Sequence, residues 1–123
     1  MTMINKRKMR KIEGNTACVL MTMGEPYTNP IGEKVTNWVN ACEFMGILSL
    51  QAGDSNYSTH KTKLEESSHI LICEYDAEIY AYADQNTRII AKDRMYDVLL
   101  IDNPDELDEH LEIYLRYVGG QNG

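Results

Sequence analysis

Histidine is the side chain best suited to acid–base catalysis or metal binding near neutral pH. The chain has three: His60 lies in a polar stretch, His69 opens an apolar run, and His110 follows an acidic run. No two of them stand at the spacing of a zinc-binding pair. We therefore expect surface or strand-edge histidines, and neither a metal nor a cofactor.

The cysteines offer no better site for chemistry. Cys18, Cys42 and Cys73 are odd in number, far apart and set in apolar surroundings. A metal centre needs ligands that are closer together or more numerous. Free cysteine is among the most often buried residues, so we expect reduced core thiols in a protein made in the cytosol.

Catalytic motifs are also missing from the sequence. It has no glycine-rich phosphate loop, and neither EGNTACV nor QAGDSNY has the strand–elbow–helix setting of a nucleophilic serine. One acidic cluster lacks the order of acids, central glycine and final glutamate of a calcium loop. It comprises Asp102, Asp105, Glu106, Asp108 and Glu109. We expect a solvated turn there, and a protein that is not an enzyme.

Charge is distributed unevenly along the chain, whose net charge is −7. The first eleven residues hold five basic side chains and no acid, namely Lys6, Arg7, Lys8, Arg10 and Lys11. The remainder holds 7 basic and 19 acidic residues, and such an acidic body argues against general nucleic-acid binding. The basic arm, residues 1–12, is either a tail without a target or an electrostatic contact. Its target would be nucleic acid or an acidic protein surface, including a neighbouring copy.

Residues 13–120 are expected to form one domain with a modest core, because 43% of the chain is apolar. No stretch approaches the roughly 18 apolar residues of a membrane span, and no secretory signal follows the basic start. Apolar runs predict strands at 15–23, 34–50, 69–75, 78–83, 87–92 and 94–102. Breakers after the first run predict a turn there: Gly24, Pro26, Asn29, Pro30 and Gly32.

The spacing of these runs predicts a small sandwich or barrel. In the run 34–50, Trp38, Cys42, Phe44, Leu48 and Leu50 share one parity, so they would face the core. The segments 78–83 and 87–92 flank DQN, a hairpin turn, and KDR would close the next hairpin.

The C-terminal run NPDELDEHLEIYLRYVGG admits two structures. Asn103 as N-cap and Pro104 at the first position favour a helix. Alternation of Leu111, Ile113 and Leu115 with polar neighbours favours a strand. A turn at 104–109 followed by a strand would satisfy both patterns.

A polar stretch, AGDSNYSTHKTKLEESS at about 52–68, separates two apolar runs. Connections in compact domains are usually about four to six residues, and longer ones tend to be functional or disordered. It follows GILSL and precedes HILICEYD, and farther along stands TRIIAKDRMYDVLLIDNPDELDEHLEIYLRYVGGQ. In this order the pieces resemble the head-closure, or stopper, proteins of the head–tail connector of long-tailed bacteriophages, including Bacillus prophage relatives.

The resemblance covers roughly residues 14 to 120, and it implies a small antiparallel β-barrel with a long inter-strand loop and little helix. It also implies a strand at Leu111 to Val118. Such proteins form a ring, commonly dodecameric, in the neck of the virion. They bind below the portal and adaptor, close the channel on the packaged DNA and receive the tail-terminator or tail-completion protein, with no membrane involved. The implied channel-loop residues are Asp54, Ser55, Asn56, Tyr57, Lys61, Lys63 and Leu64.

Two other functions stay open at this point. An acidic phage-encoded inhibitor that mimics DNA on a host protein would explain the acidic body, although not the basic arm. A small hydrolase or metal-dependent enzyme would need a motif that the sequence lacks.

Overall fold

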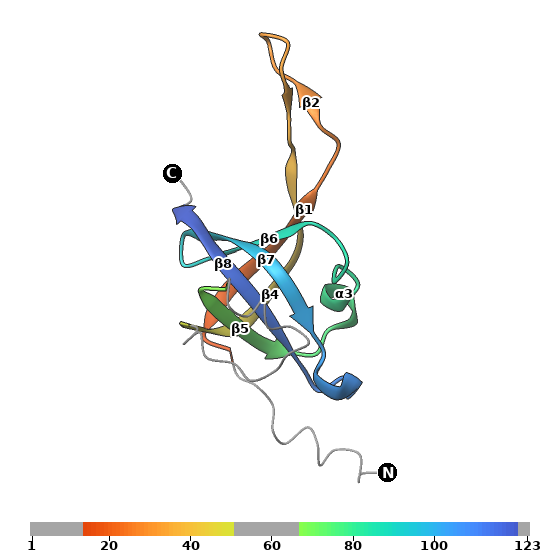
Figure 1. Cartoon of the computed structure of the whole chain (residues 1–123), viewed down its shortest axis with the longest axis vertical. Coiled ribbons are helices and arrows are strands. Elements are labelled where there is room, and N and C mark those ends of the chain that lie inside the picture. The colour runs from red at the N-terminus through yellow and green to blue at the C-terminus, as the bar shows by residue number, and fades with distance from the viewer. Residues whose placement is uncertain (1–13, 51–66, 121–123) are drawn as a thin grey trace.

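The computed structural model describes residues 14–50 and 67–120. Its body is a closed barrel of six antiparallel strands in the order β1-β4-β5-β8-β7-β6 (Figure 1). The predicted all-β barrel with little helix is therefore confirmed. The strands are β1 (Thr16–Met23), β4 (Trp38–Leu50), β5 (His69–Glu74), β6 (Thr87–Ala91), β7 (Arg94–Asp102) and β8 (His110–Gly120).

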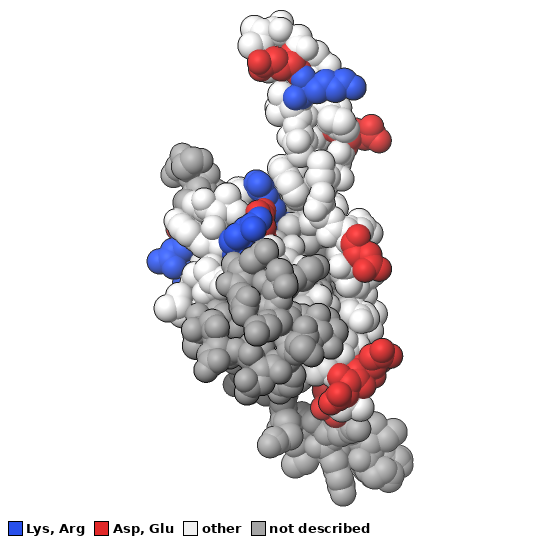
Figure 2. Space-filling view, in the orientation of Figure 1, with Lys and Arg blue, Asp and Glu red and all other residues white. Residues whose placement is uncertain are grey.

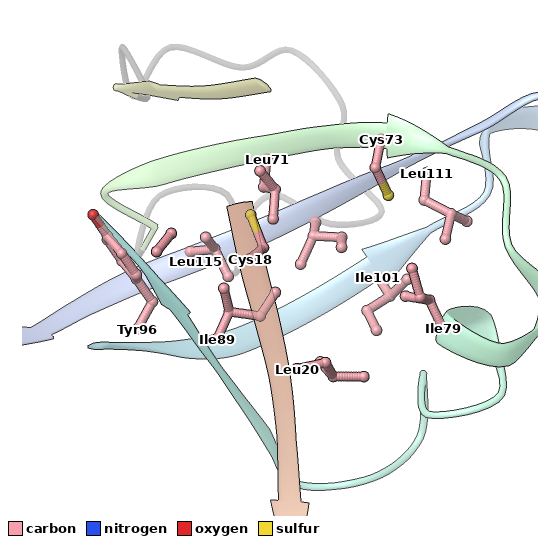
Figure 3. Close-up of a cluster of buried hydrophobic side chains, with 12 residues drawn as sticks. Cys18, Leu20, Leu71, Cys73, Ile79, Ile89, Tyr96, Ile101, Leu111 and Leu115 are labelled. Atoms are coloured by element: carbon pink, nitrogen blue, oxygen red, sulfur yellow. The ribbon is translucent and has the colours of Figure 1, made fainter. Parts of the chain in front are cut away.

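Alternation along the strands builds the core. In β1, Thr16, Cys18 and Leu20 are buried, whereas Ala17, between Thr16 and Cys18, is exposed. Burying one Leu or Ile side chain contributes about 1.5–3 kcal/mol, so the packed interior is the main source of stability. The core consists of Cys18, Leu20, Leu71, Cys73, Ile79, Ile89, Ala91, Tyr96, Ile101, Leu111, Ile113 and Leu115 (Figure 3).

The run 34–50 is not one continuous strand. Residues 34–35 pair in a separate two-stranded sheet, and β4 begins at Trp38. Within β4, Cys42, Phe44 and Leu48 pack against the core, as their parity predicted. Leu50 shares that parity but is 78% exposed, and Trp38 lies outside the core cluster. The prediction therefore fails at both ends of the strand, and at Trp38 the reason is the irregularity in the pairing of β1 with β4, which shifts the register before Cys42.

The segment 78–83 is not a strand, and the predicted hairpin across DQN is wrong. Residues Ala77–Tyr80 form α3, a single helical turn. The side chain of Asp76 caps this turn by accepting a hydrogen bond from the backbone N–H of Glu78 at 2.9 Å. Ile79 is 1% exposed and contributes to the core. One turn is too short to show helical periodicity, which is why the pattern suggested a strand.

The hairpin predicted at KDR does form, between β6 and β7. Lys92 and Asp93 have φ angles of 53° and 61°, respectively. Positive φ at both central residues defines a type I′ turn, whose twist matches that of the flanking strands.

The C-terminal run adopts the turn-then-strand structure. The 3₁₀ turn η2 (Pro104–Glu106) precedes β8, which pairs with β5 on one side and β7 on the other. This confirms the strand expected at Leu111 to Val118. A helix here would leave the edges of β5 and β7 unpaired, and unpaired edges are unfavourable.

The two ends of the barrel carry different connections. Because neighbouring strands are antiparallel, β1, β5 and β7 begin at the same end at which β4, β6 and β8 finish. We call this the loop end, since residues 1–13 and 51–66 join the barrel there. The opposite end carries the β1–β4 connection, α3 and η2, and we call it the arm end.

At the arm end, residues 24–37 extend away from the barrel as a narrow hairpin, which we call the arm (Figure 1). Its strands β2 (Tyr27–Thr28) and β3 (Lys34–Val35) form a sheet of their own. Asn29 organises the tip: its Oδ1 accepts hydrogen bonds from the N–H groups of Ile31 at 3.1 Å and Glu33 at 2.8 Å. The sequence predicted a turn here, but not its projection from the barrel.

Candidate functional site

The residues singled out from the sequence lie outside the described part of the chain. They are the channel-loop candidates Asp54, Ser55, Asn56, Tyr57, Lys61, Lys63 and Leu64, and the basic-arm candidates Lys6, Arg7, Lys8, Arg10 and Lys11. The structure does describe where their segments join the barrel. β4 ends at Leu50 and β5 begins at His69, while the N–H of Asn15, just before β1, donates to the carbonyl of Gly46 at 3.0 Å. Both segments therefore join the loop end.

Charge differs between the described barrel and these two segments. The described residues include 5 Lys or Arg and 15 Asp or Glu. Residues 1–13 and 51–66 together include 7 Lys or Arg and 4 Asp or Glu. Residues 74–86 and 102–112, which surround α3 and η2, hold ten carboxylates and no Lys or Arg. Figure 2 shows carboxylates following one edge of the molecule. The acidic surface therefore lies at the end of the barrel opposite to the start of β1, the end of β4 and the start of β5.

The base of the 51–66 segment is fixed by Ser68. Its N–H donates to the carbonyl of Leu115 at 2.8 Å, and its Oγ accepts from the N–H of Tyr117 at 2.8 Å. The same Oγ lies 2.9 Å from Nδ1 of His69. Because Oγ already accepts the Tyr117 N–H, its own proton is available to the imidazole, and this arrangement suits a neutral His69.

Aromatic rings line this base. The ring of His69 meets that of Tyr96 edge-on at a centroid distance of 4.9 Å, and Tyr96 meets Tyr117 in the same way at 5.7 Å. Burial lowers the pKa of His69, and the positive charge of Arg94 lowers it further. Contacts with β7 and β8 thus hold the start of β5 in place.

At the root of the arm, β6, β7 and β8 bring together two arginines and one aspartate. Arg88 Nε donates to Asp97 Oδ1 at 3.0 Å, and Arg116 Nη2 donates to Asp97 Oδ2 at 3.2 Å. The guanidinium of Arg88 also lies 4.8 Å from the ring centroid of Trp38, the first residue of β4. The carboxylate of Asp97 thus links guanidinium groups from the two strands that flank β7.

Two hollows lie beside this cluster. One, of about 470 Å³, is lined by Ala83, Asp84, Gln85, Asn86, Val98, Leu99 and Leu100. The other, of about 300 Å³, is lined by Trp38, Asn86, Thr87, Arg88, Asp97, Val98, Leu99 and Arg116. They share Asn86, Val98 and Leu99, so they form one continuous surface depression, which we call the root groove. The pairing of β7 with β8 is irregular between Val98 and Leu100, along the floor of this groove.

The acidic turn after β7 is held by an internal network. Asn103 is 6% exposed, its Nδ2 donates to Asp108 Oδ1 at 2.8 Å, and its Oδ1 accepts from the N–H of Asp108 at 3.1 Å. A backbone bond from the N–H of Tyr75 to the carbonyl of Glu109 joins this turn to the start of the α3 connection. The solvated turn expected here is thus an ordered one.

The described residues offer no further site for chemistry. Among them, no group of three or more His, Cys, Asp or Glu side chains could hold a metal ion. His110 Nε2 lies 3.0 Å from Glu112 Oε2, so this histidine has a carboxylate partner. Cys18 and Cys73 are free and buried, and burial raises their thiol pKa values to about 11 and about 12, respectively.

No family model matches this chain, and a search of curated proteins finds no significant similarity. In the part of the chain that the structure describes, no helix is both long enough and apolar enough to cross a membrane.

Sequence reasoning missed the arm and the root groove. Gly24, Asn29 and Gly32 signalled a turn, yet the positions between them carry no strong strand pattern. The groove unites residues from four separate segments, and no local pattern relates Trp38 to Arg88 or Arg116. The one available signal was the opposite charge of Arg88 and Asp97 on adjacent hairpin strands.

Proposed function

We propose that this chain is a subunit of a phage head-closure ring. In this role the ring binds below the portal and adaptor after packaging, closes the DNA channel, and receives the tail-terminator or tail-completion protein. The role is structural, not catalytic, and its site of action is the neck of the virion. The ordered sequence resemblance and the barrel fold both support this proposal.

One observation carries it furthest: residues 1–13 and 51–66 join the same end of the barrel. Their balance of Lys and Arg over Asp and Glu contrasts with the acidic barrel. In a ring with the loop end toward the channel, acidic walls would repel DNA phosphates, while Lys61 and Lys63 would contact them. Such a division of charge lets DNA pass and then be held.

The closed barrel changes how subunits of such a ring would meet. Every barrel strand pairs on both sides, so no barrel strand has a free edge that a ring neighbour could pair with. Subunit contacts in the proposed ring must therefore use side-chain surfaces of the barrel and the arm.

Electron microscopy of the chain mixed with portal and adaptor rings tests the proposal. We expect an added ring layer beneath the adaptor. Connectors that remain unchanged at saturating concentration of the folded chain would refute it.

A loop deletion tests the channel role separately. We expect a chain lacking Ser55 to Glu66 to fold and join the connector, because surface loops contribute little to a core. Filled heads carrying it should lose DNA. The matched control replaces the same residues by a Gly/Ser segment of equal length, which separates loop length from loop chemistry. If the deletion unfolds the chain, the segment belongs to the core and the channel role is wrong.

The acidic arm end favours one second candidate, an inhibitor that mimics DNA on a host nuclease. Ten carboxylates without Lys or Arg around α3 and η2 are the observation behind it. Replacing Asp105, Glu106 and Glu109 by their amides would abolish mimicry but leave an added ring layer unchanged. Tight nuclease binding that these changes remove, with no ring layer, would favour the inhibitor.

A further inference from the structure

The outer face of β4 and β5 carries apolar side chains at positions that are usually polar. Side chains alternate between the two faces of a strand, and the solvent-facing positions of an antiparallel sheet are normally hydrophilic. Leu71 of β5 points into the core (Figure 3), so Ile70 and Ile72 on either side of it point outward. On β4, Met45 is 52% exposed and Ile47 is 37% exposed. This part of the barrel therefore presents apolar side chains to the outside.

These side chains adjoin one another across three strands. The strand register places Met45 opposite Ala17 of β1, and Ile47 opposite Ile72 of β5. Side chains of directly opposite residues on one face of a sheet contact each other. We call the resulting surface the outer patch, which consists of Ala17, Met45, Ile47, Ile70 and Ile72. Contiguous apolar surface on the outside of a small barrel is typical of a contact surface.

The rim of the outer patch is acidic. Glu43 precedes Met45 by two positions on β4, and Glu74 follows Ile72 by two positions on β5. Glu112 of β8 pairs directly with Ile72. No Lys or Arg stands on β1, β4 or β5. A segment that combines apolar side chains with positive charge would therefore match both the patch and its rim.

The chain has such a segment, and it attaches beside the outer patch. Residues 1–13 include five Lys or Arg, one Glu and five Met or Ile. The N–H of Asn15 donates to the carbonyl of Gly46 at 3.0 Å, and a methyl group on Gly14 would lie 2.6 Å from the carbonyl carbon of Met45. The glycine therefore lets the chain start directly against β4. Thirteen residues reach at most about 43–47 Å, whereas the patch is only three strands wide, about 10 Å.

Charge selects this segment over the other candidates. Residues 51–66 also join β4 and β5, but they include two Lys and three Asp or Glu, a net charge of −1. Residues 1–13 have a net charge of +4. A second copy of the patch would bring the same three carboxylates against the rim, and like charges brought together are unfavourable. Of these three occupants, only residues 1–13 are attracted by the acidic rim.

We propose that residues 1–13 dock on the outer patch of their own subunit. The Met and Ile side chains cover the patch, and the Lys and Arg side chains approach the carboxylates of the rim. Attachment at Gly14 keeps the segment at a high local concentration beside its site. The inference goes beyond the proposed ring and concerns the isolated chain, so the outcome of either experiment leaves the other standing.

Oxidation of Met45 by hydroxyl radicals, read by mass spectrometry, tests the docking. We expect a chain lacking residues 2–11 to be oxidised at Met45 about tenfold faster than the full chain, the change that docking worth about 1.4 kcal/mol would produce. Met23, on β1 at the arm end and 46% exposed, is the internal control, and its rate should not change. An equal rate at Met45 in the two chains would refute the docking.

Charge reversal within the full chain provides a second variant that keeps the segment length. We expect Lys6→Glu, Arg7→Glu and Lys8→Glu together to expose Met45 as the deletion does, because the rim then repels the segment. This variant decides the question if the deletion also raises the rate at Met23, which would indicate a disturbed barrel. Circular dichroism and thermal melting should match those of the unmodified chain.

Compensating changes on the rim should restore the protection. Glu43→Lys and Glu74→Lys, added to the charge-reversed segment, should return Met45 to the slow rate of the unmodified chain. Glu25→Lys and Glu33→Lys on the arm make the same change in total charge away from the patch, so they should not. Equal recovery with both pairs would refute a contact at the rim.

Dilution separates the alternative occupants. Docking within one subunit gives the same protection of Met45 at every protein concentration. Protection that falls on dilution would place the segment of another copy on the patch and overturn the proposal. Protection that persists in the chain lacking residues 2–11 would overturn it as well, since another part of the molecule would then cover the patch.

Discussion

Gly46 of β4 lies against Leu71 of β5, so closely that a methyl group on Gly46 would be 2.8 Å from Leu71 Cδ1. The same methyl group would lie 3.1 Å from the carbonyl oxygen of Ile72. Leu71 is fully buried, so it has little room to move aside. The glycine therefore leaves room for the Leu71 side chain beside β4. The β-bulge of β4 lies at Ala41 and not at Gly46.

Gly46→Ala should accordingly destabilise the barrel. Overpacking of a core costs about 1–3 kcal/mol, and we expect a loss of that size in urea unfolding. Gly119→Ala is the matched control, since a methyl group there meets nothing within 4 Å. A Gly46→Ala protein as stable as this control would show that β4 and β5 can move apart freely.

Asn103 should matter more than any carboxylate of the acidic turn. Asn103→Ala removes the buried side chain that accepts from the N–H of Asp108 and donates to its carboxylate, and we expect a loss of about 1–3 kcal/mol. Asp108→Asn keeps an oxygen acceptor and tolerates the φ of 58° at that position, so it should be nearly neutral. Equal losses from both substitutions would mean that the Asp108 charge, rather than the hydrogen bonds, holds the turn.

His69 should make stability depend on pH. Its pKa is lowered in the folded state, so as the pH falls through the ordinary value of 6.5 the unfolded chain takes up a proton first. Stability should therefore decrease below that pH and level off below the folded-state pKa. His69→Phe keeps an aromatic ring against Tyr96. We expect the urea midpoint of this variant to fall less between about pH 7.5 and about pH 5.5 than that of the unmodified chain. An unchanged slope in His69→Phe would contradict the assignment.

The three thiols should differ in reactivity. Cys42 is half-buried, and burial and then the charges of Glu78 and Asp76 raise its pKa. Cys18 and Cys73 are buried with pKa values of about 11 and about 12. We expect iodoacetamide to label Cys42 slowly in the native protein at mildly alkaline pH, and the other two only after unfolding, as read by mass spectrometry. Native labelling of Cys18 or Cys73 at the rate of Cys42 would show that the barrel opens readily.

Local patterns in the sequence determined most of the strands. Alternation in β1, β5 and β7 follows from the two-residue period of a strand with one buried face, and the tight turn at Lys92 and Asp93 needs only local geometry. The same two-residue period predicted the core-facing side chains in the middle of β4, because alternation is visible in consecutive residues. The sequence also separated a basic segment from an acidic body.

Tertiary structure decided what local patterns left open. Asn103 to Gly120 could be helix or strand, and the free edges of β5 and β7 selected the strand. Ile79 lies in a single helical turn, and its side chain is buried in the core. The common end of residues 1–13 and 51–66, the direction of the arm, and the meeting of Trp38 with Arg88 all depend on strand order. Strand order is set by contacts between residues far apart in the chain, which no local pattern specifies.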